Sequence, residues 1–253
     1  MTVLVGGVGE LFQGDLDLGR LAAESLKNDG LGPDVMVEEL YYGAVAVTQR
    51  IEELRPEALV LVGAVRRGRT PGSVERRMVT PQSLSRDELQ AAVGDAVTGY
   101  VGIDLIIEVA TGLSFLPRHT ITVEVEPEYV GPVEGLTPCA ARGLAEALEL
   151  VRMEVRRLPL FQLAAHLRPL VASDRLHPAP ALVVIRDLLG QLELLEREGS
   201  WGRAAALRDQ LRLEIATCQT DAGMDGEDWA LWEALVEGVD RVQSAEASTP
   251  PVA

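Results

Sequence analysis

The chain has 253 residues, 47% of them hydrophobic, which suits one α/β domain with an appendage better than two full domains. Its net charge of −16 would repel the phosphates of nucleic acids, and its two distant cysteines and three histidines argue against a disulfide framework and a zinc site. No apolar run reaches the roughly 18 residues of a membrane span and no charged leader precedes the first one, so we expect a cytoplasmic protein that binds no membrane.

Short apolar runs alternate with helical periodicity through the first 155 residues. Strands are predicted at 2–6, 35–40, 57–65, 73–79 and 119–126, and helices at 17–28, 44–54, 87–97, 102–113 and 137–158. This alternation predicts an α/β fold, a doubly wound, mostly parallel sheet with helices on both faces. Ligands of such sheets bind at the carboxyl ends of the strands, where we expect loops 6–16, 63–72 and 127–137 to converge.

After residue 158 only helical periodicity remains. Helices are predicted at 161–172, 179–199, 201–217 and 227–243. The predicted organisation is an α/β domain at 1–158, an all-helical appendage at 159–243 and a disordered tail at 244–253. Within the appendage, residues 194–215 weakly resemble the helical-hairpin motif of UvrB and UvrC, which mediates protein contacts, and an ordinary helical bundle is the simpler interpretation.

The first strand leads into a glycine-rich turn, "GGVGELFQGDLDLG" (6–19), in which Asp15 and Asp17 flank Leu16. Phe12 stands where a dinucleotide-binding GxGxxG motif needs its third glycine, and no Gly-Lys-Ser/Thr of a P-loop follows. We expect Asp17 to cap the next helix and Asp15 to hold the turn.

Three stretches together form one motif pattern. They are "VLVGGVGELFQGDLDLG" (3–19), "ALVLVGAVRRGRTPGSVE" (58–75) and "TVEVEPEYVGPVEGLTPCA" (122–140). The first stretch is a strand followed by a glycine turn, and the second is a strand followed by a loop that closes in Pro-Gly. The third is a strand followed by Glu-Pro, a short loop and Gly-Leu-Thr-Pro before a helix. This pattern resembles the hydrogenase maturation endopeptidases, nickel-dependent proteases that trim the C-terminal extension of NiFe hydrogenase large subunits. The resemblance covers about residues 2–155.

The resemblance implies metal ligands at three positions: an acid in the first loop, an Asp ending the third strand and a His before a later helix. Leu16, Gly63 and Gly99 occupy these positions, and none of them offers a ligand atom to nickel. The resemblance thus implies a divergent member without catalytic residues or a metal of its own. If activity is retained, the nickel is that of the substrate.

Several charged residues of the cleft loops are candidates for binding. They are Glu10, Asp15, Asp17, Arg66, Arg67 and Arg69. Five arginines in "RRGRTPGSVERR" (66–77) form the one basic cluster of the chain, which predicts a solvated loop and hairpin, with docking of an acidic partner segment as the alternative. A further alternative is an all-oxygen site for Mg²⁺ or Mn²⁺, made by Glu10, Asp15, Asp17 and Asp104.

The functional hypothesis follows from the resemblance and from its missing ligands. We expect a hydrogenase maturation protease-like protein that binds a hydrogenase large-subunit precursor, or another assembly protein, through the cleft and the appendage. The lost ligands leave open whether it is an enzyme. The competing hypothesis is a non-catalytic scaffold or interaction protein unrelated to hydrogenase that keeps the protease fold.

Overall fold

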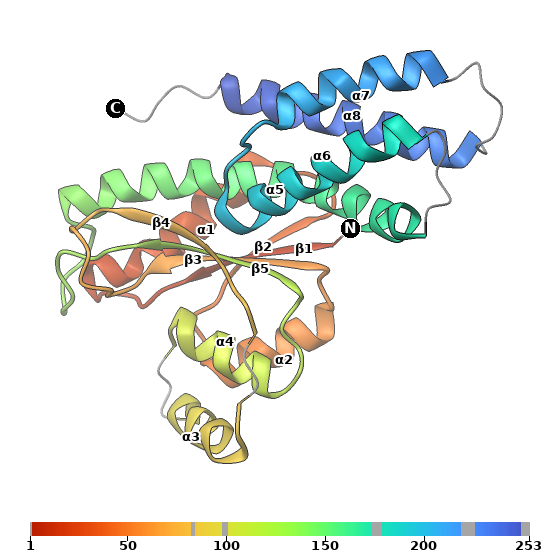
Figure 1. Ribbon diagram of the computed structural model, residues 1–253. Coiled ribbons are helices and arrows are strands. Elements are labelled where there is room, and N and C mark those ends of the chain that lie inside the picture. Colours follow the sequence, from red (N-terminus) through yellow and green to blue (C-terminus); the bar gives the residue numbers. More distant parts are fainter. Residues whose placement is uncertain (1, 82–83, 98–100, 174–178, 219–225, 249–253) are drawn as a thin grey trace. The chain divides into compact units, whose positions relative to one another are not determined.

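The computed structural model describes residues 2–81, 84–97, 101–173, 179–218 and 226–248 (Figure 1). The chain divides into two compact units, Met1–Val155 and Arg156–Ala253, and the boundary falls within one long helix, α5 (Pro138–Ala172). Within the described ranges, no helix is long and apolar enough to cross a membrane.

The first unit is built on a five-stranded sheet. Its strands are β1 (Val3–Val8), β2 (Val35–Glu39), β3 (Ala58–Ala64), β4 (Val74–Met78) and β5 (His119–Val125). The order is β2-β1-β3-β5-β4, in which the first four strands are parallel and β4 runs antiparallel to β5 at the edge. The predicted mostly parallel sheet is therefore confirmed.

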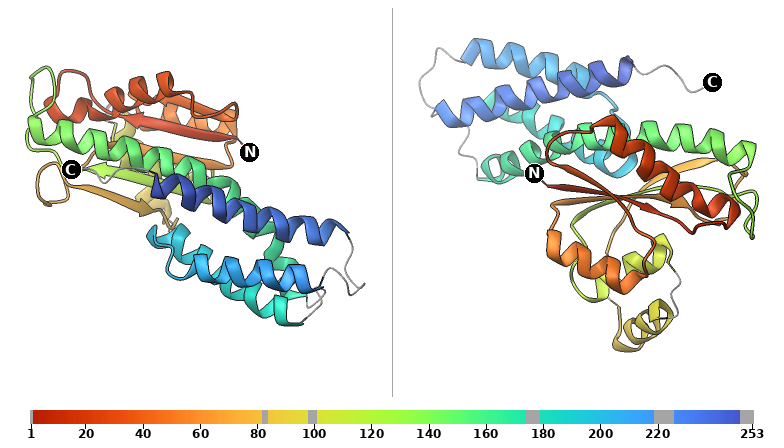
Figure 2. Two further views of the ribbon diagram at one scale, coloured as in Figure 1. Left: turned by 90° about the horizontal axis from the view of Figure 1, so that it is seen from above. Right: turned by 180° about the vertical axis from the view of Figure 1, so that it is seen from behind.

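Helices cover both faces of this sheet, as predicted (Figures 1 and 2). One face carries α1 (Leu18–Asp29), which follows the short 3-10 helix η1 (Gly14–Asp17), and the first part of α5. The other face carries α2 (Ala44–Leu54) and α4 (Ile103–Gly112), and α3 (Arg86–Val97) packs against these two helices, farther from the sheet. The strands β1 and β3 are almost wholly buried between these layers, which explains their continuous apolar sequences.

Two glycines bring α1 close to β1. A Cβ on Gly7 would lie 2.0 Å from the carbonyl oxygen of Gly19, and a Cβ on Gly19 would lie 2.0 Å from that of Val8. Neither position can carry a side chain without moving the helix off the strand. This close packing fixes the turn between β1 and α1 at the carboxyl edge of the sheet.

The second unit contains the rest of α5 with α6 (Ala179–Glu198), α7 (Ala204–Cys218) and α8 (Gly226–Ala247). The predicted break between helices 137–158 and 161–172 is wrong, because α5 runs through Pro159 and Pro169. Buried apolar residues on both sides of Pro159, among them Leu158 and Leu160, hold the helix together there.

The predicted disordered tail starts too early. Residues 244–247 belong to α8, and the Glu246 carboxylate accepts hydrogen bonds from Arg157 Nε at 2.7 Å and from the Trp201 indole at 2.5 Å. The composition of the tail could not predict this, because both partners of Glu246 lie far away in the sequence. Residues 249–253 lie outside the described residues.

Candidate functional site

The loops after β1, β3 and β5 meet at the carboxyl edge of the sheet, as predicted. The first and third are joined by backbone hydrogen bonds, from Gly14 N to Val133 O at 2.9 Å and from Asp15 N to Tyr129 O at 3.1 Å. The second and third are joined through the Glu126 carboxylate, which accepts from the backbone N–H of Arg67 at 2.8 Å. Residues far apart in sequence thereby form one surface.

Asp15 is fully buried and holds the loop that follows β5. One carboxylate oxygen accepts from the backbone N–H groups of Glu128 and Tyr129 at 2.8 and 2.9 Å and from the Thr137 hydroxyl at 3.0 Å. The other accepts from the Thr137 N–H at 2.7 Å. The predicted turn-holding role of Asp15 is confirmed, and the contacts extend it to the loop 127–137.

Asp17 does not cap the helix by its side chain, so this prediction is wrong. It occupies the N-cap position of α1 without a side-chain capping bond, and its carboxylate instead pairs with Arg20 Nε and Nη2 at 2.7 Å each. The 3-10 turn that leads into α1 supplies a preceding turn of helix, which makes a capping side chain less necessary.

A cavity of about 330 Å³ opens beside the first loop, at the ends of β1 and β3. Its apolar walls include Val8, Leu16, Val65, Val101, Ile103 and Val130. Its polar lining groups are Glu10, Arg66 and Asp104. Of the residues predicted to bind, the cavity thus brings together Glu10 and Arg66.

Gly63 is the penultimate residue of β3 and lies directly opposite Val8 of β1. A Cβ at this position would lie 2.5 Å from the Val8 carbonyl oxygen and 3.4 Å from Ile103 Cδ1. An aspartate at position 63 would therefore require β1 to shift. The backbone packing of β1 against β3 thus leaves no room for a ligand side chain at this position. Gly99, the third position that the resemblance implies, lies outside the described residues.

Replacing Gly63 with alanine is expected to lower the free energy of unfolding by about 1–3 kcal/mol, because a backbone oxygen cannot yield cheaply to the new methyl group. Gly94→Ala in α3 is the matched control, since a Cβ there meets no atom within 4 Å, and helix propensity predicts a gain of up to about 1 kcal/mol. Urea unfolding followed by circular dichroism measures both. Equal stability of Gly63→Ala and the wild type would contradict the packing argument.

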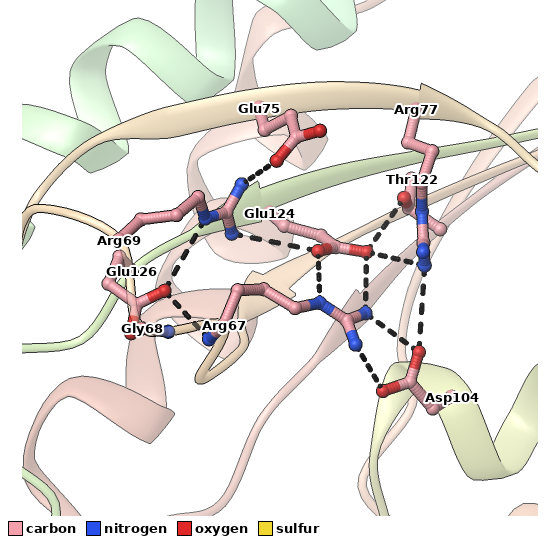
Figure 3. Close-up of polar contacts among 9 residues, drawn as sticks. All are labelled: Arg67, Gly68, Arg69, Glu75, Arg77, Asp104, Thr122, Glu124 and Glu126. Atoms are coloured by element: carbon pink, nitrogen blue, oxygen red, sulfur yellow. Dashed lines mark hydrogen bonds and ion pairs between the residues drawn. The ribbon is translucent and has the colours of Figure 1, made fainter.

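A network of ion pairs lies on the β4 side of the loops (Figure 3). At its centre is Glu124 of β5, whose side chain is 2% exposed. Its carboxylate accepts from Arg67 Nε at 2.9 Å, from Arg77 Nη2 at 2.9 Å and from the Thr122 hydroxyl at 3.0 Å. The loop 64–73 is thus tied to a buried charge near the end of β5, the strand next to the β4 edge of the sheet.

Glu126 and Asp104 extend this network on either side. Glu126 accepts from the backbone N–H groups of Arg67 and Gly68 at 2.8 and 3.1 Å, and from Arg69 Nε at 3.4 Å. The Arg67 guanidinium also donates to both Asp104 oxygens, at 2.7 and 2.9 Å. Arg67 therefore bridges the sheet and the first turn of α4 (Figure 3).

The basic cluster at 66–77 lies on a loop that is largely solvent-exposed, as predicted, but the predicted hairpin is wrong, because β4 pairs with β5. Arg67 and Arg69 pair with the buried carboxylates just described, and Arg76 pairs with the fully buried Glu154 of α5 at 2.9 Å. Arg66 does remain exposed. Because most of these guanidinium groups are already neutralised, the loop offers little free positive charge to an acidic partner.

The arginines and backbone amides determine the ionisation of the two buried glutamates. Burial by itself would raise the pKa of Glu124, but the hydrogen bond from Arg67 and the charge of Arg77 outweigh it and hold that pKa below its ordinary value. Burial would likewise raise the pKa of Glu126, and the backbone amides of Arg67 and Arg69 bring it below its ordinary value. Both carboxylates are negatively charged at neutral pH.

The alternative all-oxygen metal site is wrong. Asp15 directs its carboxylate at loop 127–137, Asp17 at Arg20 and Asp104 at Arg67. In the part of the chain that the structure describes, no three histidine, cysteine, aspartate or glutamate side chains are grouped so that they could hold a metal. These residues fit neither a nickel ion nor a hard cation.

Sequence reasoning missed a set of exposed apolar side chains at the same edge. Leu11, Phe12, Tyr129 and Val133 lie on the first and third loops and are 47–60% exposed. Large apolar residues in loops between glycines were the available signal, because such residues are normally drawn into a core.

No protein-family model matches the chain, and no curated protein has a matching sequence. Several solved structures do match. The hydrogenase maturating endopeptidase HybD from E. coli is 22% identical, with a TM-score of 0.43, covering 60% of this chain and 90% of that protein. An endopeptidase from Escherichia coli is 22% identical, with a TM-score of 0.45, covering 63% of this chain and 94% of that protein. The NiFe hydrogenase maturation protease HycI from Thermococcus kodakarensis is 20% identical, with a TM-score of 0.41, covering 61% of this chain and 91% of that protein. The first and the third carry the family name that the sequence motifs resemble.

Proposed function

We propose that this chain is a hydrogenase maturation protease-like protein that binds a NiFe hydrogenase large-subunit precursor without cutting it. The three-part motif pattern supports the family assignment. The observation that carries the non-catalytic part is the cavity at the ends of β1 and β3. At the first two positions where the resemblance implies metal ligands, the chain has Leu16 and the tightly packed Gly63.

The state of the nearby acids supports the same proposal. Asp15 and Asp17 are the carboxylates closest in sequence to the missing ligand, and both are occupied by internal partners. A hydrolytic metal needs ligands and an open coordination position, and the described cavity lining supplies an apolar wall in their place. Such a wall suits the binding of a protein segment.

The proposal is tested by incubating the full chain with a purified large-subunit precursor, from the same organism, that still carries its C-terminal extension and its nickel. We expect the two proteins to co-elute in size-exclusion chromatography. We also expect the intact mass of the precursor to stay unchanged, while an endopeptidase that has all its metal ligands shortens it in a parallel reaction.

Two outcomes would contradict the proposal, each in a different part. Shortening of the precursor by this chain, above the rate in its absence, would show that proteolysis survives the lost ligands. Failure of the precursor to co-elute would favour the competing hypothesis of a scaffold unrelated to hydrogenase.

A further inference from the structure

An exposed apolar surface borders the cavity. It consists of Leu11 (49% exposed), Phe12 (60%), Tyr129 (47%) and Val133 (49%), here called the apolar lip. Its two loops are joined by the Gly14–Val133 and Asp15–Tyr129 backbone hydrogen bonds. The buried Asp15 carboxylate fixes their relative position through its bonds to residues 128, 129 and 137. The apolar lip is therefore a prearranged surface.

Phe12 adopts a backbone conformation that bulky residues avoid. Its φ is +59°, in the left-handed region, and its side chain is the most exposed of the apolar lip. The folded chain buries little of this ring, although keeping it exposed requires a strained backbone conformation at Phe12. Backbone strain of this kind clusters at active sites and ligand-binding sites.

The apolar lip is continuous with the cavity. Glu10 and Val130, which line the cavity, are chain neighbours of Leu11 and Tyr129. The Glu10 N–H also bonds to the Leu16 carbonyl at 3.0 Å, which closes the first loop around the cavity wall. A volume of about 330 Å³ lies at the small end of the range for ligand pockets, enough for one or two side chains of a docked segment.

The charge around the apolar lip is negative. Glu10, Glu128 and Glu134 lie on the same two loops, and neither loop, 9–17 or 126–137, contains a lysine or arginine. Across the cavity, Asp104 is paired with Arg67, so that pair adds no net charge, and the exposed Arg66 adds one positive charge against the three glutamates. With a net charge of −16, the chain attracts basic partners and repels anionic membranes and nucleic acids.

We propose that the apolar lip and the adjoining cavity bind a short peptide segment that combines bulky apolar side chains with lysine or arginine. The aromatic and aliphatic side chains provide the contact area, the cavity accepts one apolar side chain, and the glutamates select for positive charge. The inference rests on the proposed function only in placing a protein partner at this edge. It adds the chemistry of the segment that is recognised.

Fluorescence anisotropy with two labelled twelve-residue peptides, one alternating leucine and lysine and the other leucine and glutamate, tests this proposal on the full chain. We expect the basic peptide to bind at least about tenfold more tightly, and its affinity to fall as salt is added. Phe12→Asn and Tyr129→Ala should each weaken its binding about tenfold. Asn tolerates the left-handed conformation, so Phe12→Asn preserves the fold, as thermal melting verifies.

Leu213→Ala is the matched control, because Leu213 is 68% exposed on α7 and lies outside the apolar lip. Wild-type affinity in both lip variants, or equal affinity for the acidic peptide, would overturn the inference. The outcome is independent of the precursor assay. Normal binding of the precursor to the lip variants would leave the proposed function intact and rule out the apolar lip as the binding surface. Binding of the basic peptide without binding of the precursor would support the apolar lip as a peptide site and contradict the proposed function.

Discussion

Replacing Asp15 with alanine is expected to lower the free energy of unfolding by about 3–5 kcal/mol. The substitution leaves the backbone N–H groups of Glu128, Tyr129 and Thr137 without their acceptor in a buried site. Each unpaired buried donor costs about 1–3 kcal/mol, although the costs do not add fully because the loop relaxes. Urea unfolding followed by circular dichroism measures the loss.

Asp17→Ala is the control for this prediction, since it removes an equally charged residue two positions away. Asp17 pairs with Arg20, whose side chain is 26% exposed and can turn to water, so we expect a loss of at most about 1 kcal/mol. Equal losses in the two variants would mean that charge near the turn matters more than the buried hydrogen bonds. Unchanged stability of Asp15→Ala would refute its role in holding the loop.

The fold of the first unit was largely predictable. Fully buried parallel strands need continuous apolar sequences, and those of β1 and β3 are distinct enough to place the centre of the sheet. The convergence of the loops then follows from topology alone, because parallel strands present their carboxyl ends at one edge. The continuous helix α5 was missed, because a proline in sequence signals a break that tertiary packing here overrides.

The contacts within the site were less predictable, for a physical reason. The arginines at 67, 69 and 76 look like a solvated charge cluster in sequence, and their partners lie 57–78 residues later in the chain. Which carboxylate a guanidinium meets depends on strand order and register. The close approach of the first loop to the loop 127–137 was likewise not predictable: a Cβ on Gly14 would lie only 3.0 Å from the Tyr129 carbonyl oxygen.

The two halves of the site differ in how they use charge. On the β4 side, arginines and carboxylates neutralise each other within the chain and stiffen the loop after β3. On the side of β1, the Asp15 carboxylate accepts hydrogen bonds from backbone N–H groups. Glu10 lines the cavity, and the Phe12 side chain is exposed to solvent. A rigid, neutralised wall thus faces an acidic, apolar one. An exposed apolar surface beside acidic side chains is the arrangement on which the proposed binding of a basic, apolar segment rests.

Glu124→Gln is expected to lower the free energy of unfolding at pH 7 by about 3 kcal/mol. The change removes the negative charge that faces Arg67 and Arg77 from a site only 2% exposed. The loss lies at the low end for a broken buried ion pair, because both arginines keep Asp104 and partial access to water. Urea unfolding gives the magnitude, and Glu75→Gln is the matched control. Glu75 also pairs with an arginine of this network but is 53% exposed, so its loss should stay below about 1 kcal/mol.

The pH dependence distinguishes a charge effect from a packing effect at Glu124. Its pKa in the folded protein lies below the ordinary value of 4.5, so its contribution is fully present above about pH 4.5 and is lost as the pH falls through the folded pKa. The stability difference between the wild type and Glu124→Gln should therefore be constant from pH 7 to pH 5 and narrow below about pH 4.5. A difference that stays constant at acid pH would mean that glutamine fails through its shape or hydrogen bonding, and that the buried charge does not hold the loop.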